Sequence, residues 1–359
     1  MVIGKYSNIK ISAVSAAVSS QWISLDTMKT EENSKVIDKL KKTTGVQGRY
    51  DAGLYQTTAD FCYAAAEEII KTKSIERESI GILVFVSQTR DYSFPATACL
   101  LAHRLGLSKE CMAFDVSLGC SGYVYGLNIV GALMNNSNVD KGLLLVGDTS
   151  AKEFHHKKKL KSSYSADAML FGDSGTATLL EKTVGETDLI GVFRTDGAGY
   201  KAIISPYGSW RHPDCKYVHT MMDGTEVFKF AIGEVPVMVK DYLEYTNTTP
   251  DDYDCFVPHQ ANRYILKTLA KRTGFPYEKF LVSIDIFANT SSASIPVSFV
   301  KEYGESWDGK VRALMCGYGV GLSWGIVSTV INKADILPLV HTDEYFDDGY
   351  PDEFEDENS

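Results

Sequence analysis

Short apolar runs with almost no polar interruption recur along this sequence, and they limit its possible folds more than any other feature. In the first half they are IGILVFVS at 80–87, AFDVS at 113–117 and GLLLVGDTS at 142–150. Strands without polar alternation are typically covered on both faces. Segments with helical spacing lie between these runs, at 59–71 and 96–107. The pattern predicts an α/β fold in which helices cover both faces of the sheets.

The second half repeats this style and predicts an internal duplication. Its apolar runs predict strands at 189–195, 254–260, 311–319 and 321–332, and its helical spacing predicts helices at 226–245 and 260–273. The first half also contains a predicted strand at 8–18. Thr57 or Thr58 is expected to cap the helix predicted at 59–71.

The linker and the end of the chain define the expected domains. Residues 182–187 are polar, which separates an N-terminal half at 1–182 from a C-terminal half at 188–335. Residues 336–359 form an acidic tail, of which positions 341–359 contain nine Asp or Glu residues and no Lys or Arg. Because such a segment buries little apolar surface, we expect the tail to be disordered.

The composition argues against several classes of protein. The chain has 359 residues, 44% hydrophobic and 23% charged, as in ordinary globular proteins. No apolar run approaches the roughly 18 residues of a membrane span, and the first residues lack a secretory signal pattern. The net charge of −10 is carried mostly by the tail, which does not favour nucleic-acid binding. Seven cysteines without a Cys-x-x-Cys pair favour reduced thiols in a cytoplasm over disulfides or a zinc site.

The stretch DVSLGCSGYVYG at 115–126 joins the end of a strand to the start of an apolar helix, with Cys120 at the junction. Gly119 and Gly122 leave room for a substrate beside the thiol. The unpaired N–H groups and the dipole of a helix N-terminus favour the thiolate, which is the nucleophilic form of cysteine. A cysteine is also a common small hydrophobic core residue, so this stretch alone leaves both interpretations open.

Three further stretches place a polar or glycine-rich turn next to a predicted strand. They are VPHQAN at 257–262 with His259, ANTSSASIP at 288–296 with Asn289, and GYGVGLSWG at 317–325. A single histidine is more often structural, an Asn before Thr-Ser is more often a helix cap, and glycine-rich turns are common. Their occurrence together, in this order after a Cys-Ser-Gly turn, favours an active site between the two halves.

With these motifs the chain resembles the β-ketoacyl-acyl-carrier-protein (ACP) synthase III family of thiolase-like condensing enzymes. The resemblance covers about residues 8–332 and includes FGDSGTATLL at 171–180. It implies a thiolase-like fold, in which two duplicated α/β halves form a five-layered αβαβα sandwich. It also implies that Cys120, His259 and Asn289 are the catalytic residues.

The resemblance further implies a reaction without cofactor or metal. Cys120 would attack the thioester of an acyl-CoA or acyl-ACP and hold the acyl group. Malonyl-ACP would then lose CO₂ while His259 and Asn289 donate hydrogen bonds to the enolate, whose carbon attacks the acyl group to give a 3-oxoacyl-ACP. The implied setting is fatty acid biosynthesis by a cytoplasmic homodimer.

Other residues take their expected roles from the same resemblance. The backbone N–H groups of Cys120 and Val320 would form the oxyanion hole. Phe94, Gly319 and Gly321 would bind substrate, with Phe94 lining the acyl pocket across the dimer interface, although core packing is an open alternative for it. A basic face that meets the acidic ACP would comprise Lys229, Arg263, Lys271 and Arg272. The open alternative is that these residues belong to an ordinary solvent-exposed helix face with no docking role.

Five positions depart from the family pattern. Val320 stands where the family more often has Gly, although either residue supplies a backbone N–H. Lys39 and Thr43 stand where members that use acetyl-CoA commonly have Trp and Arg. Tyr264 stands where an Arg is expected, so the acyl donor stays open between CoA and a carrier protein. Ala288 replaces the usual Gly before Asn289 and is small enough to be tolerated.

Other functions stay open at this point. The same fold could pass the acyl group to an oxygen or nitrogen nucleophile, in secondary metabolism or glycan modification, and this route releases no CO₂. The chain could also be a non-catalytic partner subunit, although such subunits usually lack the cysteine, or a Cys–His hydrolase. A metal site is least favoured, because His155 and His156 are adjacent within the basic stretch 155–161, which we interpret as an exposed loop.

Overall fold

Two β-sheets organise the structure, a computed structural model that describes residues 1–152, 169–185, 189–206, 209–213 and 220–349. The strands of the first sheet lie in the order β15 (Val340–His341), β2 (Ile9–Val18), β8 (Ser174–Lys182), β7 (Lys141–Asp148), β5 (Ile80–Val86) and β6 (Met112–Val116). Those of the second sheet lie in the order β1 (Val2–Tyr6), β9 (Leu189–Thr195), β14 (Ser323–Asn332), β13 (Lys310–Gly319) and β12 (Cys255–Pro258).

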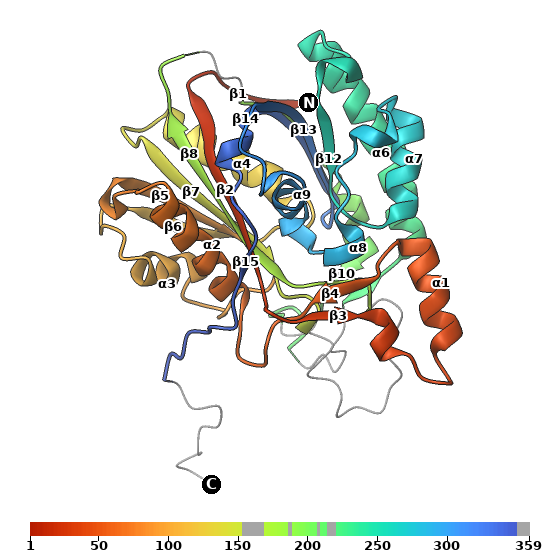
Figure 1. The fold of residues 1–359 in the computed structure, drawn as a ribbon. Helices are drawn as coiled ribbons and strands as arrows, with labels where there is room; N and C mark the ends of the chain where they lie inside the picture. The colour runs from red at the N-terminus through yellow and green to blue at the C-terminus, as the bar shows by residue number, and fades with distance from the viewer. Residues whose placement is uncertain (153–168, 186–188, 207–208, 214–219, 350–359) are drawn as a thin grey trace.

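Helices cover both faces of each sheet. On the outside, α2 (Thr58–Thr72) and α3 (Thr97–Arg104) pack on the first sheet, and α6 (Gly224–Thr246) packs on the second with α7 (Arg263–Thr273) beside it. Between the sheets lie α4 (Gly122–Asn135) and α9 (Ser294–Tyr303), which contact strands of both (Figure 1). The predicted αβαβα sandwich is therefore confirmed. The smaller elements are α1 (Ser34–Thr44), α8 (Ile284–Phe287) and the strand pairs β3 (Trp22–Ser24) with β4 (Gly48–Tyr50) and β10 (Ile203–Ile204) with β11 (Met221–Met222).

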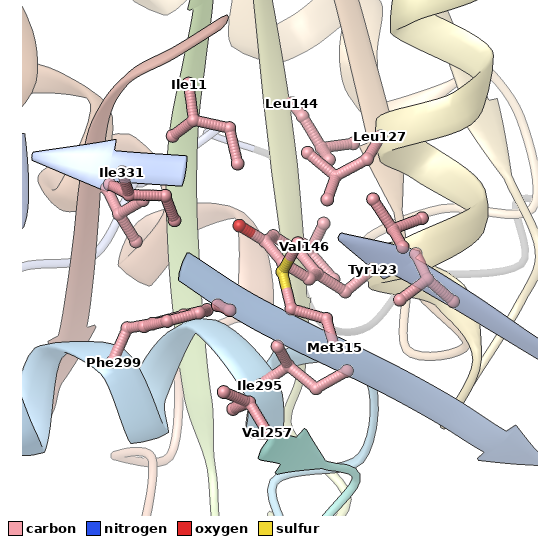
Figure 2. Close-up of a cluster of buried hydrophobic side chains, with 14 of the residues drawn as sticks. Ile11, Tyr123, Leu127, Leu144, Val146, Val257, Ile295, Phe299, Met315 and Ile331 are labelled. Carbon is pink, nitrogen blue, oxygen red and sulfur yellow. The ribbon is translucent and has the colours of Figure 1, made fainter. Parts of the chain in front are cut away.

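Apolar side chains from the three central layers fill the space between the sheets. Figure 2 shows Tyr123 and Leu127 of α4 with Ile295 and Phe299 of α9 in one cluster with Met315 of β13. All five are buried, and full burial of a large apolar side chain contributes about 1.5–3 kcal/mol. This position between two sheets explains why the helix after Cys120 is apolar on nearly every face.

Local capping signals set where the helices begin. Thr57 and Asp60 form a capping box at the start of α2, so Thr57 is the capping residue of the two that the sequence offered. The helix predicted from residue 260 starts later, at Arg263, because the Asn262 side chain accepts a hydrogen bond from the Ile265 N–H and ends the preceding turn.

Strand pairing in the sheets is mixed, and the two ends of the chain cross between the sheets. β5 is parallel to β6 and β7, whereas β8 is antiparallel to both β7 and β2. The continuous apolar runs therefore reflect coverage on both faces rather than parallel pairing. β1 pairs with β9 in the second sheet, and β15 pairs with β2 in the first. The division of the sequence at 182–187 falls between β8 and β9 and stays a prediction.

The prediction that the tail from residue 336 is disordered is wrong for residues 336–349. Ile336 and Leu337 are buried, and β15 extends the first sheet. The Gln56 side-chain N–H groups donate to the carbonyls of Thr342 and Glu344 at 2.9 and 3.1 Å. The prediction considered only the acidic composition, and it did not allow for the burial of Ile336 and Leu337 or for hydrogen bonds to the backbone carbonyls of Thr342 and Glu344. Residues 350–359 and the basic stretch 155–161 lie outside the described residues.

Candidate active site

The Cys120 thiol lies between the two sheets, at the start of α4. Its turn follows β6 and faces the end of β13 from the second half of the chain. A Cβ added to Gly319 would lie 2.7 Å from the Cys120 Sγ and 2.6 Å from its Cβ, so the Gly319 backbone lies directly against the nucleophile. Cys120 is 8% exposed, which makes it a buried but reachable thiol.

The protonation state of Cys120 differs from the sequence-based expectation. Burial raises the pKa of the Cys120 thiol to about 11, and the nearby Asp148 carboxylate adds to this shift. Hydrogen bonds from the backbone N–H groups of Val320 and Cys120 and from the Ser291 side chain act in the opposite direction but do not outweigh burial. Burial of the thiol thus opposes the thiolate form that the helix N-terminus favours. The two expected oxyanion-hole donors, Cys120 and Val320, do lie at the sulfur.

Asn289 is held by backbone contacts with the segment that precedes β8. Its N–H donates to the Leu170 carbonyl at 2.9 Å, and its carbonyl accepts from the Gly172 N–H at 3.1 Å. Its side-chain Oδ1 accepts a hydrogen bond of 2.9 Å from the Ser291 N–H. Because this bond occupies the oxygen, the NH₂ is the group of the buried amide that could donate to a substrate.

His259 follows β12 and is almost completely buried. Its backbone N–H donates to the Cys316 carbonyl at 2.8 Å, and its Nδ1 lies 2.8 Å from the Ser294 hydroxyl. The Tyr318 ring packs edge-on against the imidazole, with 5.4 Å between the ring centroids. Burial lowers the pKa of His259 to about 3, although a hydrogen bond to the Ser291 backbone opposes the shift. The ring is therefore neutral across the physiological range.

Ser291 connects the three expected catalytic side chains. Its N–H donates to the Asn289 Oδ1. Its backbone lies close enough to the His259 ring, and its side chain close enough to the Cys120 sulfur, to influence the pKa of each group. Its φ of 49° is unusual for a residue other than glycine. Side chains that lie far apart in the sequence thus meet around one turn between the two sheets.

Two kinds of residue at this site were missed by the sequence analysis. Ser291 and Ser294 stand inside the quoted ANTSSASIP motif, where they appeared only as small residues of a turn. Asp148 ends the apolar run of β7 and is fully buried. An acidic residue that closes an apolar strand was the available signal, since a buried carboxylate needs a specific reason.

The expected substrate-binding residues lie in different environments. Gly319 touches Cys120, as described above, and Gly321 lies in the turn between β13 and β14. Phe94 is 78% exposed in the single chain, which excludes core packing within that chain. The roles of Phe94 and Gly321 stay predictions.

The expected carrier-docking residues lie on α6 and α7. The Arg272 guanidinium donates to the Ile232 carbonyl of α6 at 3.0 Å, which connects the last turn of α7 to α6. Lys229 is exposed and forms an ion pair with Glu226 at 2.8 Å, which offsets part of its charge. Arg263 packs against Gly45 at the end of α1, where a Cβ would lie 2.7 Å from the arginine Nε. Lys271 lies in the last turn of α7.

The structure also shows the surroundings of the positions that depart from the family pattern. Tyr264 stacks on Phe228, with 5.5 Å between the ring centroids and 22° between the planes. Lys39 and Thr43 lie on α1, and the Thr43 hydroxyl donates to the Lys39 carbonyl at 2.9 Å. Ala288 has φ 56° and ψ −156°, a conformation that strains any side chain, so the expectation that it is simply tolerated is incomplete.

Two cavities lie away from this site. One, of about 840 Å³, lies between α2 and the segment 340–346, and the other, of about 520 Å³, lies at the end of α7. Among the described residues no group of three His, Cys, Asp or Glu side chains has the arrangement of a metal site. Within the same residues, no helix combines the length and apolarity needed to cross a membrane.

Comparison with known proteins identifies the family. Residues 114–197 match the family model for 3-oxoacyl-[acyl-carrier-protein (ACP)] synthase III, and residues 243–331 match the model for its C-terminal part. The chain is 32% identical to a β-ketoacyl-[acyl-carrier-protein] synthase III of Sinorhizobium medicae over 305 residues, which cover 79% of this chain and 87% of that protein. The chain belongs to the β-ketoacyl-ACP synthase III family.

Solved structures agree with this assignment. A 3-oxoacyl-(acyl-carrier protein) synthase from Burkholderia xenovorans LB400 is 31% identical, with a TM-score of 0.88 over 95% of this chain and 99% of that one. A 3-oxoacyl-(acyl carrier protein) synthase III from Pseudomonas aeruginosa PAO1 is 27% identical, with a TM-score of 0.79 over 93% and 100% of the two chains. As a β-ketoacyl-ACP synthase III family member, the chain is a condensing acyltransferase with the thiolase-like fold.

Proposed function

We propose that this synthase III-type enzyme transfers an acyl group from a thioester to Cys120 and condenses it with malonyl-ACP, giving a 3-oxoacyl-ACP and CO₂. The observation that carries the proposal is the meeting of Cys120, His259 and Asn289 at Ser291. No cofactor is needed, because the loss of CO₂ supplies the carbanion and both halves of the reaction exchange thioesters.

The first half-reaction uses the groups around the sulfur. Cys120 attacks the acyl carbonyl, and the oxygen becomes negatively charged in the tetrahedral intermediate. The N–H groups of Cys120 and Val320, which lie at the sulfur, can donate to that oxygen. Removal of one such donor typically costs roughly 10²–10³ in kcat.

The second half-reaction uses the two neutral polar side chains. When malonyl-ACP loses CO₂, charge develops on its thioester oxygen. The Asn289 amide has its oxygen occupied by Ser291, so its NH₂ can donate to the enolate oxygen. The His259 ring is held neutral by burial and can donate its one N–H to the same oxygen when the substrate replaces the Ser291 carbonyl as the acceptor. A preorganised pair of donors in a buried site stabilises the enolate strongly. The enolate carbon then attacks the acyl carbonyl and releases Cys120.

We also propose an acidic ACP as the partner and a homodimer as the assembly, acting in fatty acid biosynthesis. The basic face of α6 and α7 supports the first. The second is supported by the position of β6 at the edge of the first sheet and by the exposure of Phe94, which a second copy would cover. A cytoplasmic location fits the free thiols of the six described cysteines. Light scattering of the purified chain tests the dimer.

Intact-protein mass spectrometry tests the reaction. We expect wild-type protein mixed with acetyl or octanoyl thioesters of CoA and of ACP to gain one acyl mass. The Cys120→Ala variant should gain none, and the Cys99→Ala variant, which removes an exposed thiol, should behave as wild type. Acyl mass on Cys120→Ala would refute the assignment of the nucleophile.

Release of CO₂ separates condensation from the other acyl transfers. Acylated enzyme given malonyl-ACP should release one CO₂ for each 3-oxoacyl-ACP formed. Acyl transfer to an alcohol or amine without CO₂ would identify the oxygen or nitrogen route instead, and rapid loss of the acyl mass to water alone would identify a hydrolase.

A further inference from the structure

Arg49 of β4 is one of the largest side chains that the fold buries almost completely, with 1% of its surface exposed. Its Nε lies 2.6 Å from the Asp51 Oδ1, and its Nη2 donates to the Asp51 Oδ2 at 3.1 Å. Because both charges are removed from water, a pair of this kind is weak evidence for stability, and well-packed apolar side chains often serve as well. The pair therefore needs another explanation.

The third arm of the guanidinium binds the backbone of the segment that precedes β8. Its Nη1 donates to the Phe171 carbonyl at 3.0 Å. Asp51 fixes the other edge of the planar group, so the ion pair sets the direction of this hydrogen bond. Arg49 thus holds one particular peptide group in place.

That peptide group is the one that binds Asn289. Phe171 and Asn289 form an isolated parallel bridge, and the Gly172 N–H donates to the Asn289 carbonyl at 3.1 Å. The peptide between residues 171 and 172 therefore accepts from Arg49 at its oxygen and donates to Asn289 at its nitrogen. Because a peptide group is planar, fixing its oxygen also fixes the direction of its N–H.

The surroundings of this peptide are tightly packed. A Cβ added to Gly172 would lie 2.2 Å from the Phe287 carbonyl oxygen and 3.3 Å from the Arg49 Cβ, at the place where β4 runs beside α8 (Figure 1). Ala288, immediately before Asn289, has φ 56° and ψ −156°, and strained backbone persists only where its surroundings fix it. The position of the Asn289 amide thus depends on contacts outside its own turn.

We propose that Arg49, fixed by Asp51, is a positioning residue that holds Asn289 for the condensation step. The proposal rests on the proposed function, in which the Asn289 amide donates to the enolate formed from malonyl-ACP. It separates the two half-reactions. Acylation of Cys120 uses the backbone N–H groups at the sulfur and does not need Asn289, whereas decarboxylation does.

Single-turnover kinetics of the separate half-reactions test the proposal. We would follow the acyl mass that Cys120 gains from the octanoyl thioester of N-acetylcysteamine, and then the CO₂ that the acylated enzyme releases from saturating malonyl-ACP. The variant Arg49→Met/Asp51→Asn removes both charges together, so no unpaired charge stays buried. Because a misplacement of about 1 Å at a reacting group can cost 10²-fold, CO₂ release should slow roughly 10- to 100-fold while acylation stays within about two-fold of wild type.

A double-mutant cycle with Asn289→Ala identifies the route. Asn289→Ala should itself slow CO₂ release, and adding Arg49→Met/Asp51→Asn to it should slow the release no further, because the two changes remove the same interaction. Arg49→Lys keeps the charge but lacks the planar fork, so it should give an intermediate rate of CO₂ release. This conservative variant decides the outcome if Arg49→Met/Asp51→Asn does not fold.

Arg104 and Asp60 provide the matched control. They form a second buried Arg–Asp pair, with 2.8 Å between the Arg104 Nη1 and the Asp60 Oδ1, on the outer helices α3 and α2. Whatever Arg104→Met/Asp60→Asn costs in Tm, it should leave both half-reactions at their wild-type rates.

The outcomes separate this role of Arg49 from the proposed function. If the Arg49 variants slow both half-reactions equally, or slow neither, or slow CO₂ release further in the Asn289→Ala background, Arg49 does not act through Asn289 and the proposal is wrong. If wild type gains no acyl mass from this thioester or from the CoA and ACP thioesters, or if its acylated form releases no CO₂ from malonyl-ACP, the proposed function fails, and the role of Arg49 fails with it.

Discussion

The contact between Gly319 and the Cys120 sulfur makes Gly319→Ala a direct test of the active-site geometry. An alanine Cβ would lie 2.7 Å from Sγ, whereas ordinary contact begins at 3.4 Å, so the sulfur or the β13 backbone must move by about 0.7 Å. A misplacement of about 1 Å at a reacting group can cost 10²-fold, and we therefore expect acylation to slow roughly 10- to 100-fold. Overpacking should also cost about 1–3 kcal/mol of stability.

Two measurements separate these effects. The rate at which acyl mass appears on Cys120 reports the geometry, and the change in Tm reports the strain. With about 2.1 cal/mol/K per residue, 359 residues convert this loss to a Tm decrease of roughly 1–4 °C. Gly197→Ala is the control, because no atom lies within 4 Å of its added Cβ, and it should change neither quantity. Acylation of Gly319→Ala at the wild-type rate would refute the contact and the placement of the nucleophile derived from it.

Three further predictions address strain, protonation and docking. Ala288→Gly should raise the free energy of unfolding by roughly 0.5–2 kcal/mol in urea titrations. It removes about 1–3 kcal/mol of backbone strain, which exceeds the entropic cost of introducing a glycine. The control is Asn247→Gly, which should be nearly neutral because Asn readily adopts the φ of 52° and ψ of 47° found there. His259 stays neutral in the folded chain down to about pH 3, whereas the unfolded chain binds that proton below about pH 6.5. The stability contributed by the neutral ring is therefore present above pH 6.5 and is lost as the pH falls toward 3. His259→Gln should reduce the slope of unfolding free energy against pH in this range, and an unchanged slope would contradict the burial argument. Lys271→Glu should raise the KM for malonyl-ACP several-fold at low salt with kcat unchanged, whereas Lys240→Glu, exposed on α6, should not; equal effects of the two would argue against a docking face.

The sequence predicted the layered architecture because burial leaves a direct record in it. The run IGILVFVS and the all-round apolar helix after Cys120 both occur where a segment has protein on two sides, and the structure places β5 and α4 in that way. The sequence does not distinguish parallel from antiparallel strands in the same way. An antiparallel strand such as β8, covered by helices on both faces, carries the same apolar residues as a parallel one.

The site was predictable where its residues stand at the ends of strands, as Cys120 and His259 do. The raised pKa of the Cys120 thiol was not predictable, because the burial of the sulfur and its proximity to Asp148 follow from three-dimensional packing. Nor could the sequence show that Ser291 would lie beside both the His259 ring and the Cys120 sulfur, because neither residue is close to it in the chain. The tail was misjudged for a related reason: its composition is acidic, but its first residues have apolar anchoring sites on the body.

The exchange of the terminal strands has a consequence for biosynthesis. β1 precedes the strands of the first sheet in the chain yet belongs to the second sheet, and β15 follows the strands of the second sheet yet pairs with β2 in the first. Both pairings join segments very distant in sequence, and such contacts form late because the intervening chain must first be brought together. The second sheet finds β1 already synthesised, whereas the first sheet lacks β15 until the end of the second half has been made. The nascent N-terminal half therefore carries an unpaired edge at β2 until β15 has been synthesised, which makes this edge a place where chaperone protection is needed.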